Sequence, residues 1–150
     1  MSVLTEETVD ALTVSKITAV LLVEDVEPCA TFWVERLGFE KTVEVPDGDK
    51  IGFVILKKGT VEVMYQSYAS IEKDAPPAVS TTPRGPTFLY VEVDSLDEIV
   101  AAMKGVEAVM PERLTFYGAR EILVRDPAGH FVTFAQFGAV QDGEDGGRSS

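Results

Sequence analysis

A tight turn flanked by two apolar runs is the clearest pattern in the chain and covers residues 118–137. Pro127 presets φ for a turn, and the Asp126 side chain can accept hydrogen bonds from backbone groups two residues on. Gly129 permits a positive φ at the point where the chain reverses. The pattern therefore predicts a β-hairpin with strands on both sides of this turn.

The first half of the chain predicts a strand, a helix and three further strands. The apolar and β-branched runs that predict strands lie at 17–23, 39–45, 51–56 and 61–68. An apolar stripe with helical spacing follows the first of these and is formed by Cys29, Phe32, Trp33 and Leu37. Asp25 is placed to begin this helix and Gly38 to end it.

The second half repeats this order. A strand at 88–93 precedes a helix that begins with a capping box of Ser95 and Glu98. A strand at 106–114, which Pro111 interrupts or confines to an edge, leads into the hairpin. Because strand, helix and three strands occur twice, the chain predicts an internal duplication.

The predicted organisation is α+β, with two tandem βαβββ modules at 16–69 and 87–138. Residues 70–86 are rich in proline, serine and threonine, a composition that favours neither helix nor sheet, and are predicted to be a linker. The predicted ends are an N-terminal arm at 1–15 and an acidic flexible tail at 139–150.

Charge and cysteine content narrow the function. The 150 residues carry a formal net charge of −12, which repels nucleic acid and anionic lipid and attracts cationic ligands; the plainer reading of this charge is solubility. The single cysteine, Cys29, excludes an intramolecular disulfide and is expected in the core. No apolar run approaches the roughly 20 residues of a membrane span and no signal peptide is evident, so a cytoplasmic protein without membrane or nucleic-acid partners is expected.

Several short motifs together resemble the vicinal oxygen chelate superfamily of glyoxalase I, extradiol dioxygenases, fosfomycin-resistance transferases and bleomycin-resistance proteins. They are Val23, Glu24 and Asp25, then Phe32 and Trp33, then Leu37, Gly38 and Phe39, then 61–64 and 91–94, and finally Asp126, Pro127, Ala128 and Gly129. The resemblance spans residues 16–138. It implies two modules that curl into a cup, with ligand on the concave face, and a homodimer formed by docking or by module exchange.

Strand alternation assigns residues to the cup lining, since neighbours on a strand point to opposite faces. The lining set is Glu62, Met64, Gln66, Phe88, Tyr90, Glu92, Glu121, Phe131 and Thr133, with Thr18 from the first strand. These ten residues are the predicted ligand-binding residues.

The resemblance places metal ligands of the superfamily at four positions, here Thr18, Glu62, Phe88 and Thr133. Only Glu62 is a competent ligand, and Phe88 would obstruct the site. The single histidine, His130, is expected to be a solvated residue of the turn. We therefore expect no metal and no other cofactor; the alternative is a divalent metal held weakly by Glu62 and Glu121.

Aromatic side chains exceed what metal chemistry requires: Trp33, Phe53, Tyr65, Tyr68, Phe88, Tyr90, Phe116, Tyr117 and Phe131. Together with the acidic lining they predict a binding protein of the bleomycin-resistance type that sequesters an aromatic or cationic small molecule, with a role in antibiotic resistance. The alternative is a lyase, isomerase or dioxygenase-like enzyme with an atypical metal site, or with Glu62 as a general base. That second role expects a raised pKa of Glu62 beside Phe88.

Overall fold

Two four-stranded mixed sheets form the protein, and the computed structural model describes residues 10–81 and 83–138. The first sheet has the order β1-β4-β3-β2 and contains β1 (Val20–Val23), β2 (Glu40–Asp47), β3 (Lys50–Lys58) and β4 (Val61–Ser67). The second has the order β5-β8-β7-β6 and contains β5 (Phe88–Glu92), β6 (Ala108–Leu114), β7 (Ala119–Arg125) and β8 (Phe131–Phe137). The α+β fold with two βαβββ units is confirmed.

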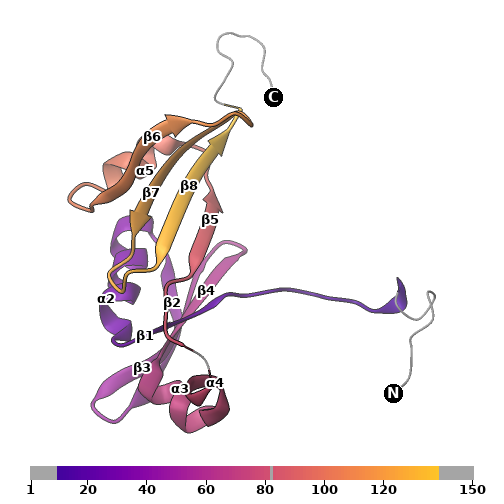
Figure 1. The fold of residues 1–150 in the computed structure, drawn as a ribbon, viewed down its shortest axis with the longest axis vertical. Coiled ribbons are helices and arrows are strands. Elements are labelled where there is room, and N and C mark those ends of the chain that lie inside the picture. The colour runs from indigo at the N-terminus through magenta and orange to yellow at the C-terminus, as the bar shows by residue number, and fades with distance from the viewer. Residues whose placement is uncertain (1–9, 82, 139–150) are drawn as a thin grey trace.

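Both sheets are built in the same way. The first and last strands of each unit, β1 with β4 and β5 with β8, pair in parallel, and all other neighbouring strands are antiparallel. Figure 1 shows the second sheet, in orange and yellow, above the first, in purple and magenta.

One helical segment follows the first strand of each unit. Helix α2 (Val26–Thr31) follows β1 and runs into a π-helical turn, η1 (Phe32–Arg36), and α5 (Leu96–Ala102) follows β5. The Ser95 hydroxyl accepts a hydrogen bond of 3.2 Å from the backbone N–H of Glu98, as the capping box predicts. Cys29 lies fully buried in the core, where burial raises the pKa of its thiol to about 12 and keeps it protonated.

The predicted linker contains most of one short helix and all of another, although its composition favours neither helix nor sheet. Helix α3 (Tyr68–Asp74) begins where the Ser67 hydroxyl accepts a hydrogen bond from the backbone N–H of Ser70, at 3.0 Å. Helix α4 (Pro76–Ser80) has its prolines in the first turn, where a missing N–H costs no helical hydrogen bond. Residue composition did not predict these helices because it does not show where a serine or a proline can begin a helix.

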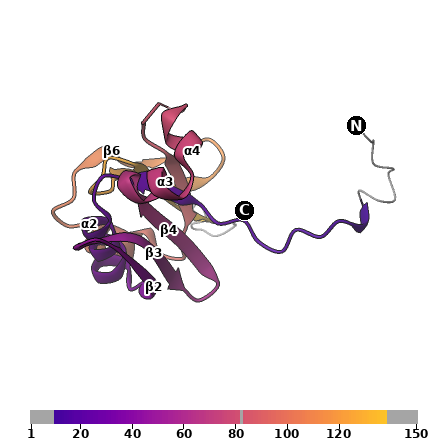
Figure 2. The same ribbon diagram turned by 90° about the horizontal axis from the view of Figure 1, so that it is seen from below.

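The segment before β1 extends away from both sheets (Figures 1 and 2). Strand β1 begins at Val20 rather than at the predicted Ile17, and Leu12, Val14 and Ile17 are largely exposed. The first nine residues of the predicted arm and the whole predicted tail, 139–150, lie outside the described residues.

Core residues from both units form one hydrophobic cluster. Val54, Leu56, Val63 and Tyr65 from the first sheet and Val124, Val132 and Phe134 from the second belong to it, together with Trp33 and Cys29. The two units therefore share a core through the sheet faces that carry the helices.

A chain of buried hydrogen bonds crosses between the two units. The indole N–H of Trp33 donates to the Tyr65 hydroxyl at 2.9 Å, and this hydroxyl donates to Oδ2 of Asp126 at 2.6 Å. Burial, aided by the Asp126 carboxylate, raises the pKa of Tyr65, so its hydroxyl stays a donor. Oδ1 of Asp126 accepts the backbone N–H groups of Ala128 and His130, at 3.0 and 2.8 Å. Asp126, which the sequence predicts to bond the backbone of its own turn, thus also binds the first unit through the Tyr65 hydroxyl.

His130 is buried, not solvated, which corrects its predicted place. Its side chain is 4% exposed, and the backbone N–H of Thr87 donates to its Nδ1 at 2.8 Å. Since Nδ1 accepts, Nε2 carries the proton and donates to the carbonyl of Leu22 at 2.9 Å. The imidazole therefore joins β1 of the first unit to Thr87, the residue just before β5 of the second unit.

We expect Tyr65→Phe to lower the free energy of unfolding by about 2–4 kcal/mol, because it leaves the Trp33 indole N–H and one Asp126 oxygen buried without their partner. Urea unfolding followed by circular dichroism measures this loss. Tyr68→Phe is the matched control, since the Tyr68 hydroxyl has no hydrogen bond among the described residues and its removal should change stability by less than about 0.5 kcal/mol. Equal stability of the two variants would contradict the role assigned to the Tyr65 hydroxyl.

Candidate functional site

The face of the second sheet turned away from the core carries most of the predicted lining; we call it the open face of that sheet. Strand register places Phe88 opposite Phe131, Tyr90 opposite Thr133 and Glu92 opposite Ala135. The next strand adds Glu121 beside Ala135 and Leu123 beside Thr133. The alternation derived from the sequence therefore holds in the second sheet.

Exposed and partly exposed aromatic rings cover this open face and form what we call the aromatic floor: Phe88, Tyr90, Tyr117, Phe131 and Phe137. Phe88 is 67% exposed, Tyr90 50% and Phe137 44%. The Phe88 and Phe131 rings stack with centroids 4.6 Å apart, and the Phe137 ring lies 6.5 Å from Tyr90 and 6.2 Å from Tyr117. Ring surface of this extent, left open to solvent, is typical of a ligand or partner site.

A buried carboxylate holds the tyrosines of the floor in place. Glu121 is only 2% exposed, and its Oε2 accepts hydrogen bonds from the hydroxyls of Tyr90, at 2.6 Å, and Tyr117. Arg113 donates to Oε1 at 3.3 Å. Burial alone would raise the pKa of Glu121, but the bonds from Tyr117, Tyr90 and Arg113 together lower it. Glu121 is therefore an anion whose hydrogen-bonding capacity is taken up by its neighbours.

Tyr90 is correspondingly held as a neutral phenol. Burial and then its hydrogen bond to Glu121 raise the pKa of Tyr90. A tyrosine that stays protonated and donates to a fixed carboxylate is a rigid wall of a site rather than a proton-transfer group.

A cation closes one end of the floor. The Arg125 guanidinium lies 5.0 Å from the centroid of the Phe131 ring, and register places Arg125 and Phe88 on opposite sides of Phe131. Arg125, Phe131 and Phe88 thus form a ladder across three strands, in which the outer face of Phe88 is open.

The open face of the first sheet carries Glu62, Met64 and Gln66 with Thr18. Glu62 receives a hydrogen bond from the Thr18 hydroxyl at 3.1 Å and an ion pair from Lys16 at 2.7 Å. The bond from Lys16, aided by Thr18, lowers the pKa of Glu62 against the opposing effect of burial. The expected rise in the Glu62 pKa is therefore wrong, because a lysine from the segment before β1 reaches this carboxylate.

The residues at the four metal positions do not fit a metal site. Thr18 and Glu62 contact each other on the first sheet, whereas Phe88 and Thr133 lie on β5 and β8 of the second. Within residues 10–81 and 83–138, no three His, Cys, Asp or Glu side chains gather as a metal site would require. Glu62 and Glu121 have no hydrogen-bond partner in common. One carboxylate, two hydroxyls and an aromatic ring are a poor donor set for iron, nickel or zinc.

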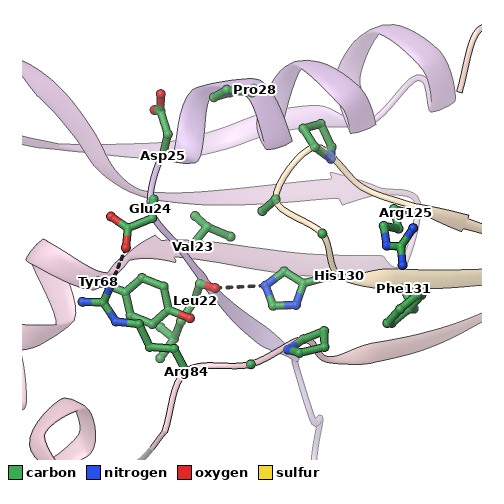
Figure 3. A pocket seen from close by; sticks show the side chains of 15 residues that line it. Leu22, Val23, Glu24, Asp25, Pro28, Tyr68, Arg84, Arg125, His130 and Phe131 are labelled. Atoms are coloured by element: carbon green, nitrogen blue, oxygen red, sulfur yellow. Dashed lines mark hydrogen bonds and ion pairs between the residues drawn. The ribbon is translucent and has the colours of Figure 1, made fainter. Parts of the chain in front are cut away.

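A cleft of about 600 Å³ lies where the two units meet, at the His130 turn. Figure 3 shows Tyr68 and Arg84 on one side of it and Arg125 and Phe131 on the other. The Arg84 guanidinium stacks 3.9 Å from the centre of the Tyr68 ring and pairs with Glu24. The cleft is thus framed by two arginines that are each held on an aromatic ring.

Sequence reasoning did not assign Tyr117, Arg113, Phe137 or Arg125 to the site. The sequence does hold a signal for Arg113 and for Phe137. Arg113 and Glu121 are equally distant from a turn centred on 117, and residues so placed face each other across a hairpin. Phe137 follows the lining register of Phe131 and Thr133 at the same spacing of two.

A family model described as the Glyoxalase/Bleomycin resistance protein/Dioxygenase superfamily matches residues 15–134. The chain belongs to this superfamily. No curated protein matches the chain in sequence. No helix in the described part of the chain has the length and apolar character needed to cross a membrane.

Solved structures of superfamily proteins share the fold. A glyoxalase/bleomycin resistance protein/dioxygenase from Nocardioides is 21% identical with a TM-score of 0.66, covering 94% of this chain and 95% of its own. The bleomycin-binding protein of Streptomyces verticillus, solved with copper(II)-bleomycin, is 25% identical with a TM-score of 0.55, covering 82% and 96%. A lactoylglutathione lyase from Agrobacterium tumefaciens is 16% identical with a TM-score of 0.62, covering 81% and 92%. The neighbours thus include both a binding protein and an enzyme.

The lowered pKa of Glu121 predicts how its contribution to stability depends on pH. A carboxylate with a lowered folded-state pKa stabilises the fold above its unfolded pKa of about 4.3, and this contribution is lost as the pH falls through the folded value. We therefore expect Glu121→Gln to be less stable than the native protein at pH 6 and the difference to narrow at pH 3. Urea unfolding at the two pH values measures this difference in stability. In a protein that carries Tyr117→Phe, which removes one donor to Glu121, Glu121→Gln should cause a smaller loss of stability at pH 6. A difference that widens toward pH 3 would contradict the assignment.

Proposed function

We propose that the protein binds a small aromatic or cationic molecule on the open face of its second sheet, without a metal ion, and sequesters it. The observation that carries this proposal is the aromatic floor, in which Phe88 and Tyr90 are at least half exposed while Tyr90 is pinned by the buried Glu121. Rings that are already fixed lose little conformational entropy when a ligand stacks on them.

The overall charge of the chain favours a cation over an anion as the ligand. At the floor itself, Glu121 and the exposed Glu92 are matched in number by Arg113 and Arg125, so the preference rests on the whole surface. The net charge of −12 raises the local concentration of cations around the protein. The S. verticillus neighbour was solved with a metal-bound drug, which supports a sequestering role for this fold and, by extension, a role in drug resistance for this chain.

Binding without turnover is favoured over the enzymatic alternative. The ion pair with Lys16 keeps Glu62 anionic and occupied, and Glu121 is buried and bonded to three donors that lower its pKa, so neither carboxylate is poised to take a proton from a substrate. The metal positions offer a single carboxylate, so a Lewis-acid reaction would lack its usual ligands.

Proflavine, a flat aromatic cation, and copper(II)-bleomycin are suitable first probes in isothermal titration calorimetry. We expect binding of at least one of them and expect Phe88→Ala to weaken it by about five- to 150-fold, as for the loss of one stacking ring worth about 1–3 kcal/mol. Phe116→Ala is the matched control, because Phe116 is 99% exposed and touches the floor only through an edge-to-face contact with Tyr117, and it should leave the affinity within about twofold.

Three results would overturn this proposal. Equal effects of Phe88→Ala and Phe116→Ala would remove the floor from the site. Conversion of a bound ligand to product, detected by chromatography, would favour the enzyme. Stoichiometric iron, zinc or manganese in protein purified without chelator or nickel affinity would contradict a metal-free site.

We further propose that the protein is a homodimer. The open faces of both sheets expose apolar side chains, among them Val20, Val45 and Phe88, and the segment before β1 projects from the body with Leu12, Val14 and Ile17 uncovered (Figure 2). Light scattering after size exclusion should give the mass of two chains at micromolar concentration. Deleting residues 1–15 should shift the mass toward one chain; a single-chain mass for the full protein would contradict the proposal.

A further inference from the structure

A separate cavity of about 430 Å³ lies between the two units on the other side of β5 from the aromatic floor. Val91 and Val93 contribute to its wall, and these residues alternate along β5 with Phe88 and Tyr90 of the open face. The volume falls within the range of small-molecule pockets, about 300–1,000 Å³. The proposed ligand site on the open face does not use this cavity.

The lining of the cavity is mainly apolar and aromatic. Trp33 and Phe39 contribute to it, with ring centroids 5.0 Å apart in an edge-to-face contact, and Leu37, Val61 and Ile99 complete the apolar wall. Trp33 is 2% exposed, and its indole N–H is already bonded to the Tyr65 hydroxyl. The indole therefore offers the cavity an apolar ring surface whose only polar atom is satisfied.

Charged side chains at the cavity are predominantly acidic. Asp94 and Glu98 contribute to its lining and are exposed to solvent, against a single cation, Lys58; Glu92 also borders the cavity, but the strand register places its side chain on the open face. Asp94, Glu98 and Lys58 take part in no ion pair among the described residues. The wall therefore carries one more negative than positive charge beside an apolar surface, with no internal partner for the excess.

We propose that this cavity is a second binding site, which takes a hydrophobic amine. Its apolar body would pack on Trp33, Leu37 and Val61, and its protonated amino group would lie near Asp94 and Glu98. The apolar wall alone would accept a neutral hydrophobe equally well, and the carboxylates alone would bind any cation weakly. Only a molecule with both features satisfies the whole cavity.

The single tryptophan of the chain gives this site a direct readout, since Trp33 belongs to the cavity and not to the aromatic floor. We expect 4-phenylbutylamine to change the Trp33 emission in a saturable titration. The neutral analogue 4-phenyl-1-butanol should bind about tenfold more weakly, and 4-phenylbutanoate should bind more weakly still, because both lack the cation that the carboxylates attract.

Nearly isosteric charge variants test the acidic wall without disturbing the fold. Glu98→Gln and Asp94→Asn should each weaken the amine by about two- to fivefold, and Lys58→Gln should tighten it by a similar factor, since a partly exposed charge interaction is of this size. Glu72→Gln, an exposed carboxylate on α3 away from the cavity, is the matched control and should leave the affinity unchanged.

Equal affinity for the amine and the alcohol would overturn the proposal, as would a Trp33 response that the three charge variants leave unaltered. Phe88→Ala separates this site from the proposed function. An unchanged amine titration in Phe88→Ala would support a distinct cavity site, whereas loss of the response would place the amine on the aromatic floor and refute the cavity.

Discussion

The buried carboxylate of Asp126 is the constraint on which the arrangement of the two units depends. A carboxylate in this position must have its oxygens paired, and it obtains partners from both units: the Tyr65 hydroxyl from the first sheet and backbone N–H groups of its own turn. Trp33 extends this series of hydrogen bonds to the helical segment of the first unit. His130 adds a second link between the units through its bond to the carbonyl of Leu22. Because these bonds are buried, sliding one unit against the other would leave several polar groups unpaired.

This junction directs the helix-bearing faces of both sheets into one core and leaves their other faces open. On the second sheet the open face carries aromatic rings above a carboxylate that is bonded to two phenols and a guanidinium. Such a cluster fixes the positions of these side chains. On the first sheet Glu62 is neutralised by Lys16, so the one carboxylate at the four superfamily positions is already paired, and the described residues contain no cluster of three His, Cys, Asp or Glu side chains.

Much of the fold could be read from local patterns. The apolar alternation of β5 and β8, the Ser95 capping box and the Asp126 turn each depend on residues within a few positions of one another, and each is present as predicted. The helices in the segment after β4 were missed because serine and proline there act as helix starts, which composition alone does not reveal. The membership of Arg113 and Phe137 in the site also follows from local patterns, hairpin pairing for Arg113 and strand alternation for Phe137.

The sequence by itself determined the order of elements, the faces on which side chains point, and the poverty of donors at the metal positions, since these follow from local geometry and residue chemistry. Only the tertiary structure decided which distant polar groups meet. Lys16 is 46 residues from Glu62 and Tyr65 is 61 residues from Asp126, and no local pattern records such pairings. Contacts between residues far apart in the sequence also bury His130, lower the pKa of Glu62 and form the acidic cavity beside Trp33.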